Sequence, residues 1–260
     1  MQGTVTVVDR GRVRVHSYMA PDDSLNVTTQ LLETPARVVA VDAQYALGYA
    51  DEVMAYAKDL GKPLDRLVIS HAHPDHYHGA ARFGVPVHAL PAVRQQIAAR
   101  GDGRDPTGAA VPVADVLPTV EITPGTEVID GVPFVFEAMT GGEATDELVI
   151  KLPGQRVLVA QDLVYHATHL FLGNNDVAGW RKAVDALAAD PSYDLILAGH
   201  GRPAAREVYA ELGRYLADAG ELLGEDGEAY KRAIMERYPS YGGSFLIDIG
   251  NRYLFGAHGG

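Results

Sequence analysis

The chain has 260 residues, of which 47% are hydrophobic and 22% are charged, so it can bury a full core and is neither disordered nor collagen-like. Lysine and arginine number 22 against 34 aspartates and glutamates. The resulting net charge of −12 argues against a nucleic-acid partner and against an anionic membrane surface. The absence of cysteine excludes disulfides, cysteine-ligated zinc, iron–sulfur clusters and thiol nucleophiles.

No apolar run approaches the roughly 18 residues that span a bilayer. The N-terminal segment Met1–His16 alternates valine with polar residues and contains no apolar stretch typical of a signal peptide. The sequence therefore predicts a cytoplasmic chain without a membrane partner.

Short strands and helices alternate through the first half of the chain. A hairpin that turns near Gly11 and two buried strands are expected at Thr4–Val8, Val13–Tyr18, Leu31–Glu33 and Val38–Val41. Two further strands, at Leu67–Ile69 and Val85–Leu90, lie among helices expected at Tyr45–Leu60, from Tyr77 onward and at Ala92–Ala99. The stretch Gly101–Ala114 is rich in glycine, proline and aspartate and is expected to be an irregular loop.

The second half begins with paired strands and continues with helices. The strands are expected at Val120–Ile122, Thr126–Ile129, Phe134–Ala138, Leu148–Leu152 and Val157–Ala160. A helix, a last buried strand and two further helices are expected at Asp176–Ala189, Leu195–Ala198, Val208–Ala219 and Glu228–Arg237. A terminal hairpin is expected around Gly250.

The order of these elements favours an α/β chain in which two sheets pack face to face with helices outside. No linker divides the sequence, so residues 1–260 are expected to form one domain. Within it, about residues 206–260 are expected to form a C-terminal extension of helices and a hairpin. The sequence leaves open whether this extension caps a pocket or forms a homodimer contact.

The most informative segment is His71-Ala72-His73-Pro74-Asp75-His76, which has four potential metal ligands within six residues, directly after a buried strand. Imidazole nitrogens and carboxylate oxygens are both good zinc ligands. Alternation at the strand end brings His71 and His73 to one side. Asp75 and His76 lie past a turn that Pro74 stiffens, where they can reach a second ion. The segment therefore predicts metal binding.

This segment resembles the HxHxDH signature of the metallo-β-lactamase fold superfamily, and later segments follow the order of that family's motifs. Asp42 resembles the acidic residue after an early strand, Asp162 resembles a metal-bridging aspartate, and His200 resembles the ligand of the final Gly-His-Gly motif. The resemblance covers most of residues 4–205. It implies a four-layer αββα sandwich, in which two mixed β-sheets are flanked by helices.

One departure from the superfamily pattern concerns the third ligand of the first metal. The family usually supplies a histidine there, but no histidine lies between Ala89 and Tyr165. The segment around Glu143 is instead similar to the Gly-Glu-Ala variant of alkylsulfatase-like members and of a poorly characterised branch, in which glutamate replaces histidine. Glu143 is therefore assigned as a ligand, whereas Asp146 and Glu147 are expected to be solvated loop carboxylates.

The resemblance implies two divalent ions per chain. The implied ligands are His71, His73 and Glu143 for the first ion, Asp75, His76 and His200 for the second, and Asp162 as the bridge. Asp75 is also counted as a catalytic residue. Zinc is the favoured metal, and iron or manganese are alternatives because a carboxylate ligand accepts harder metals. Two ions about 3.5–4 Å apart can share a hydroxide nucleophile.

Residues after Asp162 are candidates for contact with a substrate. His169 is a candidate substrate-contacting or proton-donating residue and His166 a second, although a packed structural role is an equal alternative for each. Tyr165 can offer a hydroxyl, but a packed tyrosine is favoured. His78, one turn beyond the ligand segment, is expected to be an exposed helix residue.

The ligand set favours a hydrolase that uses a metal-bridging hydroxide on a small ester, lactone or sulfate ester, with a small molecule as its partner. No Gly-x-Ser-x-Gly elbow, Walker loop or Gly-x-Gly-x-x-Gly segment occurs. Glu143 makes the first metal site one charge more negative than histidine would, which argues against a specialised β-lactamase. The alternatives are a non-catalytic metal-binding sensor or regulatory module on the same fold, and a hydrolase of the β-lactamase or thioesterase type.

Overall fold

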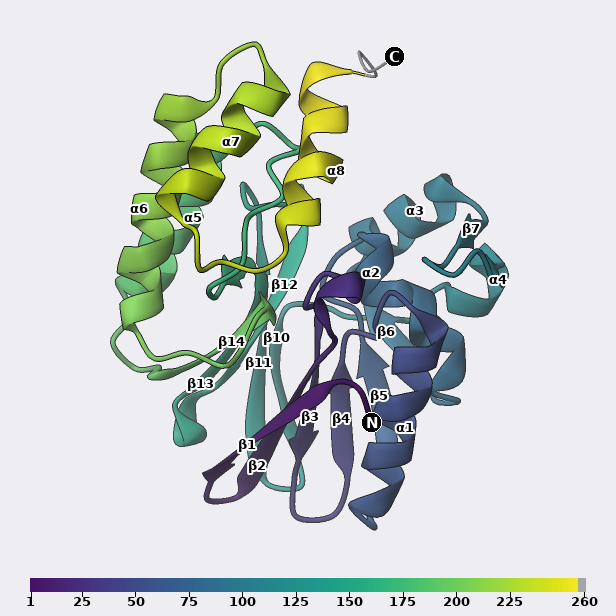
Figure 1. Ribbon diagram of the computed structural model, residues 1–260. Coiled ribbons are helices and arrows are strands. Elements are labelled where there is room, and N and C mark those ends of the chain that lie inside the picture. The colour runs from purple at the N-terminus through teal and green to yellow at the C-terminus, as the bar shows by residue number, and fades with distance from the viewer. Residues whose placement is uncertain (257–260) are drawn as a thin grey trace.

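The computed structural model describes residues 1–256, along which strands and helices alternate (Figure 1). The strands are β1 (Thr4–Arg10), β2 (Val13–Met19), β3 (Thr28–Glu33), β4 (Val38–Val41), β5 (Leu64–Val68), β6 (Val87–Ala89), β7 (Gly103–Arg104), β8 (Ala110–Val111), β9 (Val120–Glu121), β10 (Gly125–Ile129), β11 (Val132–Met139), β12 (Glu147–Leu152), β13 (Val157–Tyr165) and β14 (Leu195–His200). The α-helices are α1 (Leu47–Asp59), α2 (Pro74–Tyr77), α3 (Pro91–Arg100), α4 (Val113–Val116), α5 (Val177–Ala188), α6 (Glu207–Leu222), α7 (Gly227–Arg237) and α8 (Ser244–Phe255).

Two mixed β-sheets form the centre of the fold. The first has seven strands in the order β1-β2-β3-β4-β5-β6-β9, and the second has five in the order β10-β11-β12-β13-β14. Neighbours from β4 to β9 run parallel, as do β13 and β14, whereas the other pairs within these two sheets are antiparallel. Helices flank the pair of sheets (Figure 1), so the predicted four-layer αββα sandwich is confirmed.

Alternating apolar side chains attach the second sheet to two separate cores. In β13, Val157 and Val159 join the core shared with the first sheet, whereas Leu158 and Ala160 join a core formed with the C-terminal helices. Successive strand residues point to opposite faces, so a sheet buried on both sides needs an unbroken apolar run. This requirement explains the apolar runs Val157–Ala160 in β13 and Leu195–Ala198 in β14.

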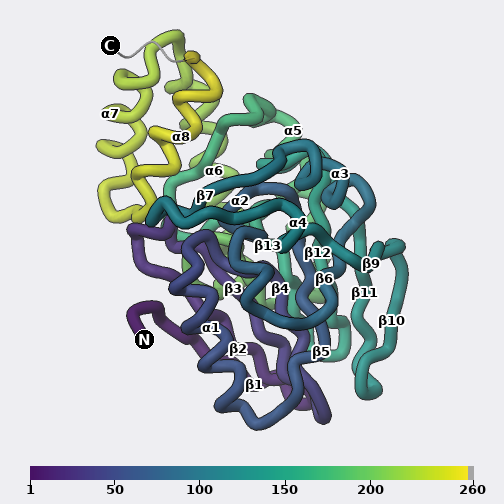
Figure 2. Tube along the Cα trace, turned by 90° about the vertical axis from the view of Figure 1, so that its right-hand side faces the viewer, coloured from purple at the N-terminus to yellow at the C-terminus, as the bar shows by residue number. Residues whose placement is uncertain are grey.

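The described part of the C-terminal extension consists of the helices α6, α7 and α8 and the loops that join them. Helices α5 and α6 pack on β13, and α7 and α8 lie together at one end of the molecule (Figure 2). The hairpin predicted around Gly250 is wrong, because Gly250 lies in the middle of α8. Glycine is a turn signal in sequence, but a Cβ at position 250 would lie 3.2 Å from the backbone nitrogen of Leu172, so the missing side chain permits a close approach. Residues 257–260 of the predicted extension lie outside the described residues.

Two smaller differences from the predicted elements have local causes. The helix expected from Tyr77 onward is a short 3-10 helix, His78–Arg82, which follows α2 directly. Helix α2 itself begins at Pro74, because proline at the first helical position needs no hydrogen-bond partner for its nitrogen and already has a helical φ. The loop predicted at Gly101–Ala114 is mostly irregular, but it contains the short pair β7–β8. None of the helices within residues 1–256 combines the length and the apolar character needed to cross a bilayer.

Candidate metal centre

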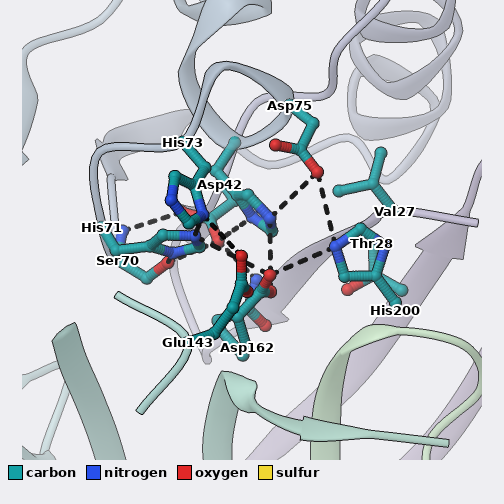
Figure 3. A network of polar contacts seen from close by, with 12 residues as sticks. Val27, Thr28, Asp42, Ser70, His71, His73, Asp75, Glu143, Asp162 and His200 are labelled. Atoms are coloured by element: carbon teal, nitrogen blue, oxygen red, sulfur yellow. Dashed lines mark hydrogen bonds and ion pairs between the residues drawn. The ribbon is translucent and has the colours of Figure 1, made fainter. Parts of the chain in front are cut away.

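Strand ends from both sheets bring the seven predicted ligands together. The segment His71–His76 follows β5, while Asp162 lies in β13 and His200 ends the neighbouring parallel strand β14. The carboxyl ends of parallel strands meet at one edge of a sheet, which is where α/β folds commonly bind ligands. Figure 3 shows six of these side chains converging on one region: His71, His73, Asp75, Glu143, Asp162 and His200.

The first predicted triad converges around Asp162. Ligand atoms of His71, His73, Glu143 and Asp162 all lie within 4.8 Å of one another. Nε2 of His71 lies 3.1 Å from Nδ1 of His73, which in turn lies 2.6 Å from Oε1 of Glu143. Oδ2 of Asp162 lies 3.7 Å from Nε2 of His71. The carboxylate assigned in place of the usual histidine therefore lies beside its predicted partners.

The second predicted triad, Asp75, His76 and His200, is equally close. Oδ2 of Asp75 lies 3.4 Å from Nε2 of His76 and 3.3 Å from Nε2 of His200. Asp162 contacts this triad as well, because its Oδ1 lies 3.2 Å from Nε2 of His76 and its Oδ2 lies 3.1 Å from Nε2 of His200. One carboxylate thus lies between the two triads.

Hydrogen bonds on the outer side of the cluster determine which ring nitrogen of two histidines faces the centre. Nδ1 of His200 lies 2.7 Å from the carbonyl oxygen of Leu25, and a carbonyl only accepts. Nδ1 of His76 lies 2.8 Å from Oδ2 of Asp42, whose carboxylate also accepts. Both Nδ1 atoms therefore carry a proton, and both Nε2 atoms face the centre, where each offers a lone pair to a metal once its own proton is displaced.

Asp42 does the same for a third histidine through Ser70. Its carboxylate accepts from the backbone nitrogen of Ser70 at 2.8 Å, from the Ser70 hydroxyl at 2.7 Å and from Nε2 of Gln161 at 2.5 Å. The Ser70 hydroxyl has one proton and gives it to Asp42, so Nδ1 of His71, 2.9 Å away, donates to Ser70. His71 consequently also turns Nε2 inward. Asp42 is fully buried and orients two histidines rather than facing the cavity.

Two backbone features let Asp162 reach the centre. Gln161 has a φ of 44°, at a point where the register of β13 against β14 shifts, and such an irregularity re-aims the side chains beside it. A Cβ on Gly199 in the adjacent strand would lie 1.7 Å from Oδ1 of Asp162. Position 199 therefore accepts only glycine while Asp162 keeps this position.

The charges of the cluster respond strongly to one another. Burial raises the pKa of the Glu143 carboxyl well above its usual range, and the charge of Asp162 acts in the same direction. Burial opposes the charged forms of His76 and His200, but the negative charges of Asp162 and Asp75 have the larger effect. The pKa of His76 is therefore raised well above its usual range, and that of His200 is raised to about 9. The cluster therefore holds protons that a divalent cation would displace.

The residues fit a metal centre by their chemistry and by their unsatisfied atoms. Nε2 of His76 and Oδ1 of Asp162 lie 3.2 Å apart, are buried and have no hydrogen-bond partner among residues 1–256. Buried polar atoms are normally satisfied, so this pair indicates a ligand between or beside them. Four imidazoles and three carboxylates form a donor set that suits zinc and also suits iron and manganese.

A cavity of about 190 Å³ opens onto the cluster. Its polar side, here called the cavity floor, consists of His73, Asp75, Glu143 and Tyr165. Its apolar side, here called the cavity wall, consists of Phe171, Leu246, Ile249 and Tyr253. Arg100 and Asn174 are further lining residues. Arg100 and the residues of the cavity wall were not predicted from the sequence, because they carry no motif.

Residues after Asp162 differ in whether they reach the cavity. Tyr165 lines it and donates its hydroxyl toward Oε2 of Glu143 at 2.9 Å and Oδ2 of Asp162 at 3.0 Å. His169 does not line it: the side chain is buried and its Nδ1 lies 2.9 Å from the hydroxyl of Tyr215. His166 also lies outside the lining, with Nδ1 2.9 Å from the carbonyl oxygen of Arg202. The structure thus places His169 among buried side chains, outside the cavity in which a contact with a substrate was predicted.

Two residues expected to be solvated are buried. His78 packs against Tyr45, with ring centroids 5.6 Å apart, and against the backbone at Gly103, so its predicted exposure is wrong. Glu147 is buried at the start of β12, where Oε1 accepts a 3.0 Å hydrogen bond from the backbone nitrogen of Ala144. Glu147 therefore supports the loop that carries Glu143 instead of facing solvent.

The two-sheet sandwich and the histidine–carboxylate cluster at its strand ends define the class of αββα proteins with a candidate metal centre between the sheets. The family model described as the metallo-beta-lactamase superfamily matches residues 25–200, a range that contains all seven predicted ligands. The chain belongs to the metallo-β-lactamase superfamily, whose members generally bind metal ions such as zinc.

Two curated relatives are sulfatases. The chain is 32% identical to the alkyl/aryl-sulfatase BDS1 of Saccharomyces cerevisiae over 125 residues, which cover 45% of this chain and 18% of that protein. It is 24% identical to a linear primary-alkylsulfatase of a Pseudomonas species over 234 residues, which cover 73% of this chain and 44% of that protein. The chain thus spans less than half the length of these relatives.

Solved structures support the fold. A metallo-beta-lactamase from Pontibacter korlensis matches with a TM-score of 0.66 at 22% identity, covering 84% of this chain and 100% of that chain. At this identity the likeness shows the fold and carries no information about the substrate.

Proposed function

We propose that this chain is a dinuclear metal-dependent hydrolase that cleaves a small sulfate ester, carboxylic ester or lactone. The observation that carries the proposal is the position of Asp162. Its Oδ1 lies 3.2 Å from Nε2 of His76, and its Oδ2 lies 3.1 Å from Nε2 of His200 and 3.7 Å from Nε2 of His71. One carboxylate in contact with both triads is suited to bridging a pair of ions.

The two triads give each ion a similar donor set. The proposed ligands are His71, His73 and Glu143 for the first ion, Asp75, His76 and His200 for the second, and Asp162 for both. When bound, divalent ions supply Lewis acidity and lower the pKa of a water that serves as the nucleophile. Zinc suits the imidazoles, and Glu143 adds a hard oxygen donor that keeps iron and manganese as alternatives.

Residues around the ligands orient them and exclude water. Tyr165 is buried, and its single hydroxyl proton is shared between Glu143 and Asp162, which couples the bridging carboxylate to the first triad. Its ring stacks on His200 with centroids 4.5 Å apart. Asp42 fixes His71 and His76 from behind, so the donors are held in place before an ion arrives.

A serine nucleophile finds no support in the cavity. Ser70 lies beside His71 and Asp42, but its side chain is buried and both contacts hold it behind the cluster. No serine or threonine lines the cavity in the part of the chain that the structure describes. Water activated at the metal centre is therefore the nucleophile that we propose.

The two curated relatives favour a sulfate ester over the other substrate classes. Both are sulfatases by description, and both matches are low in identity and partial in coverage. Glu143 as a proposed ligand also favours a sulfate ester, since its sequence segment is similar to that of alkylsulfatase-like members.

Metal analysis followed by an activity panel tests the proposal. We expect about two equivalents of divalent metal per chain, together with hydrolysis of 4-nitrophenyl sulfate, 4-nitrophenyl acetate or a lactone. A chelator should abolish this activity and added zinc should restore it, while a β-lactam should be a poor substrate. Metal content below about half an equivalent after zinc addition, or activity that survives chelation and is lost to a serine-directed reagent, would overturn the proposal.

A further inference from the structure

Three of the four residues of the cavity wall lie on one face of a single helix. Leu246, Ile249 and Tyr253 are three and four positions apart along α8, the spacing that aligns side chains on one side of a helix. All three line the cavity that His73 and Glu143 also line. An apolar surface therefore belongs to the same cavity as the metal ligands.

An aromatic side chain connects the cavity wall to the cavity floor. The ring of Phe171 packs edge-on against His73 at 5.4 Å and edge-on against Tyr253 at 5.6 Å, measured between centroids. A group bound near His73 consequently has Phe171 and then α8 as its next neighbours. This continuity places apolar contact directly beside the proposed reaction centre.

Backbone contacts hold α8 in this position. Gly250 comes close to the backbone of Leu172, and the oxygen of Gly242 accepts a 2.9 Å hydrogen bond from the nitrogen of His169. The nitrogen of Gly243 donates to Oδ1 of Asp22 at 2.8 Å. The start and the middle of α8 are therefore fastened to the body of the fold, and the wall is a fixed part of the cavity.

Arg100 adds a positive charge to the same cavity. It ends α3, is exposed, and lines both this cavity and an adjoining hollow of about 420 Å³ that also contains His73 and Asn174. The ion pairs that arginines form within residues 1–256 do not include Arg100. In a chain with a net charge of −12, an arginine without a carboxylate partner at this position is suited to an anionic ligand.

We propose that the cavity selects an anionic ester that carries a compact apolar group. The apolar group lies against α8, and the anionic group lies toward Arg100. This inference rests on the proposed function and adds the substrate class and the residues that determine it. A volume of about 190 Å³ holds about six groups the size of a water molecule, so a chain of about four carbons fits beside the anionic group and longer chains extend into solvent.

Binding of alkyl sulfonates to the metal-loaded protein tests the cavity wall, because their carbon–sulfur bond is not hydrolysed. Calorimetric titration should show affinity that rises about fourfold per methylene from ethyl to butyl sulfonate and reaches a plateau before decyl sulfonate. Ile249→Ala should weaken hexyl sulfonate about tenfold and leave ethyl sulfonate nearly unchanged. Leu254→Ala is the matched control, since Leu254 is a half-buried aliphatic residue of α8 that does not line the cavity.

The cationic contact is tested by Arg100→Gln. This variant should weaken every sulfonate by about the same factor, roughly tenfold, because the anionic group is common to the series. Arg104→Gln is the control: Arg104 is exposed and donates to the carbonyl oxygen of Gly108 at 2.8 Å. Equal affinity for all chain lengths, or an Ile249→Ala variant that behaves as the wild type, overturns the inference, as does a lack of sulfonate binding.

Turnover of the matching alkyl sulfates separates this inference from the proposed function. Chain-length-dependent sulfonate binding without hydrolysis of any ester would retain the binding preference and refute the hydrolase. Hydrolysis without dependence on chain length would retain the hydrolase and refute the selective wall. A thermal unfolding curve for each variant ensures that changes in affinity are compared between folded proteins.

Discussion

The cavity floor and the cavity wall are built in different ways. The floor comes from short segments at strand ends within residues 25–200, the range of the family match, and buried hydrogen bonds orient the cluster of which it is part. The wall comes mainly from one face of α8, beyond that range, and is held by packing and a few backbone contacts. The contrast indicates that the metal-ligand cluster and most of the apolar wall belong to separate parts of the chain and can be changed separately.

Removal of the proposed bridging carboxylate should have the largest effect, because it should abolish hydrolysis and leave the cavity wall intact. Asp162→Asn, or His71→Ala, should lower hydrolysis by at least about a thousandfold, because the charge that joins the two triads or one of their donors is lost. The cavity wall should survive, since neither residue lies in α8 or lines the cavity. Steady-state kinetics measures the loss, and circular dichroism should remain that of the wild type. Wild-type rates in Asp162→Asn would rule out the bridging role.

Glu143 allows the two proposed metal sites to be separated. Glu143→Ala should reduce the metal content from about two ions to about one and remove most activity, because the second triad keeps its three ligands. Glu143→His should restore the first ion with a stronger preference for zinc over manganese. Elemental analysis after extensive dialysis measures both results.

The best control for Glu143 is Asp146→Ala. Asp146 lies in the same loop, but its carboxylate accepts from Nε2 of Gln96 at 2.7 Å and belongs to neither triad. Glu147 is unsuitable as a neutral control because it is buried and supports the loop through Ala144. Loss of metal in Asp146→Ala together with full retention in Glu143→Ala would mean that the ligand is assigned to the wrong carboxylate.

A smaller effect on metal affinity is expected for Asp42, which lies behind the cluster. Asp42→Asn should weaken metal binding by about 10–100-fold, the range seen when a residue that orients metal ligands is removed. Competition with a chromophoric chelator measures the affinity. Asp59→Asn, at the exposed end of α1, should leave it unchanged. Equal affinities in the wild type and the Asp42 variant would show that the orientation of His71 and His76 does not depend on Asp42.

The smallest predicted effect concerns the support of the cavity wall. Burial lowers the pKa of His169 to about 4, whereas the unfolded chain binds this proton near the ordinary value of 6.5. Stability is therefore lost as the pH falls from about 6.5 toward 4, because the unfolded state takes up the proton first. His169→Gln removes that contribution, so the wild type's advantage in free energy of unfolding should shrink between about pH 7.5 and pH 5.

Urea unfolding of chelated protein at the two pH values measures this difference. The metal content of His169→Gln at neutral pH should match the wild type, because His169 lies with Tyr215 and outside the triads. A stability difference that stays constant between the two pH values would contradict the assignment.

The cavity floor could be predicted from sequence because its residue types occur in contiguous segments after apolar strands. His71 to His76 and His200 stand at strand ends, and short apolar runs identified those strands. Glu143 could be assigned only through resemblance, since one glutamate in a loop has no periodic signal. The burial of His78 was missed because it depends on Tyr45 and Gly103, which lie far from it along the chain.

The cavity wall could not be predicted, for a related reason. Gly250 favours a turn when only its neighbours are considered, but in the fold it allows α8 to approach Leu172 closely. The spacing of Leu246, Ile249 and Tyr253 is compatible with a helix, yet nothing in it indicates the cavity that the helix faces. Packing between distant segments decides both points, and a single sequence does not record it.

The contact between His200 and Leu25 has a consequence for the stability of the whole molecule. It joins β14 to the segment before β3, and Thr28, the first residue of β3, donates to the carbonyl oxygen of Ala198 at 2.7 Å. Since His71 and His200 stand 129 positions apart, any ion shared by their triads closes a long loop between the two sheets. By mass action, free metal at about a hundredfold above its dissociation constant adds about 2.7 kcal/mol to the free energy of unfolding. In a chain without disulfides, the melting temperature would then rise with the concentration of free metal, because the bound ions act as a reversible cross-link between the sheets.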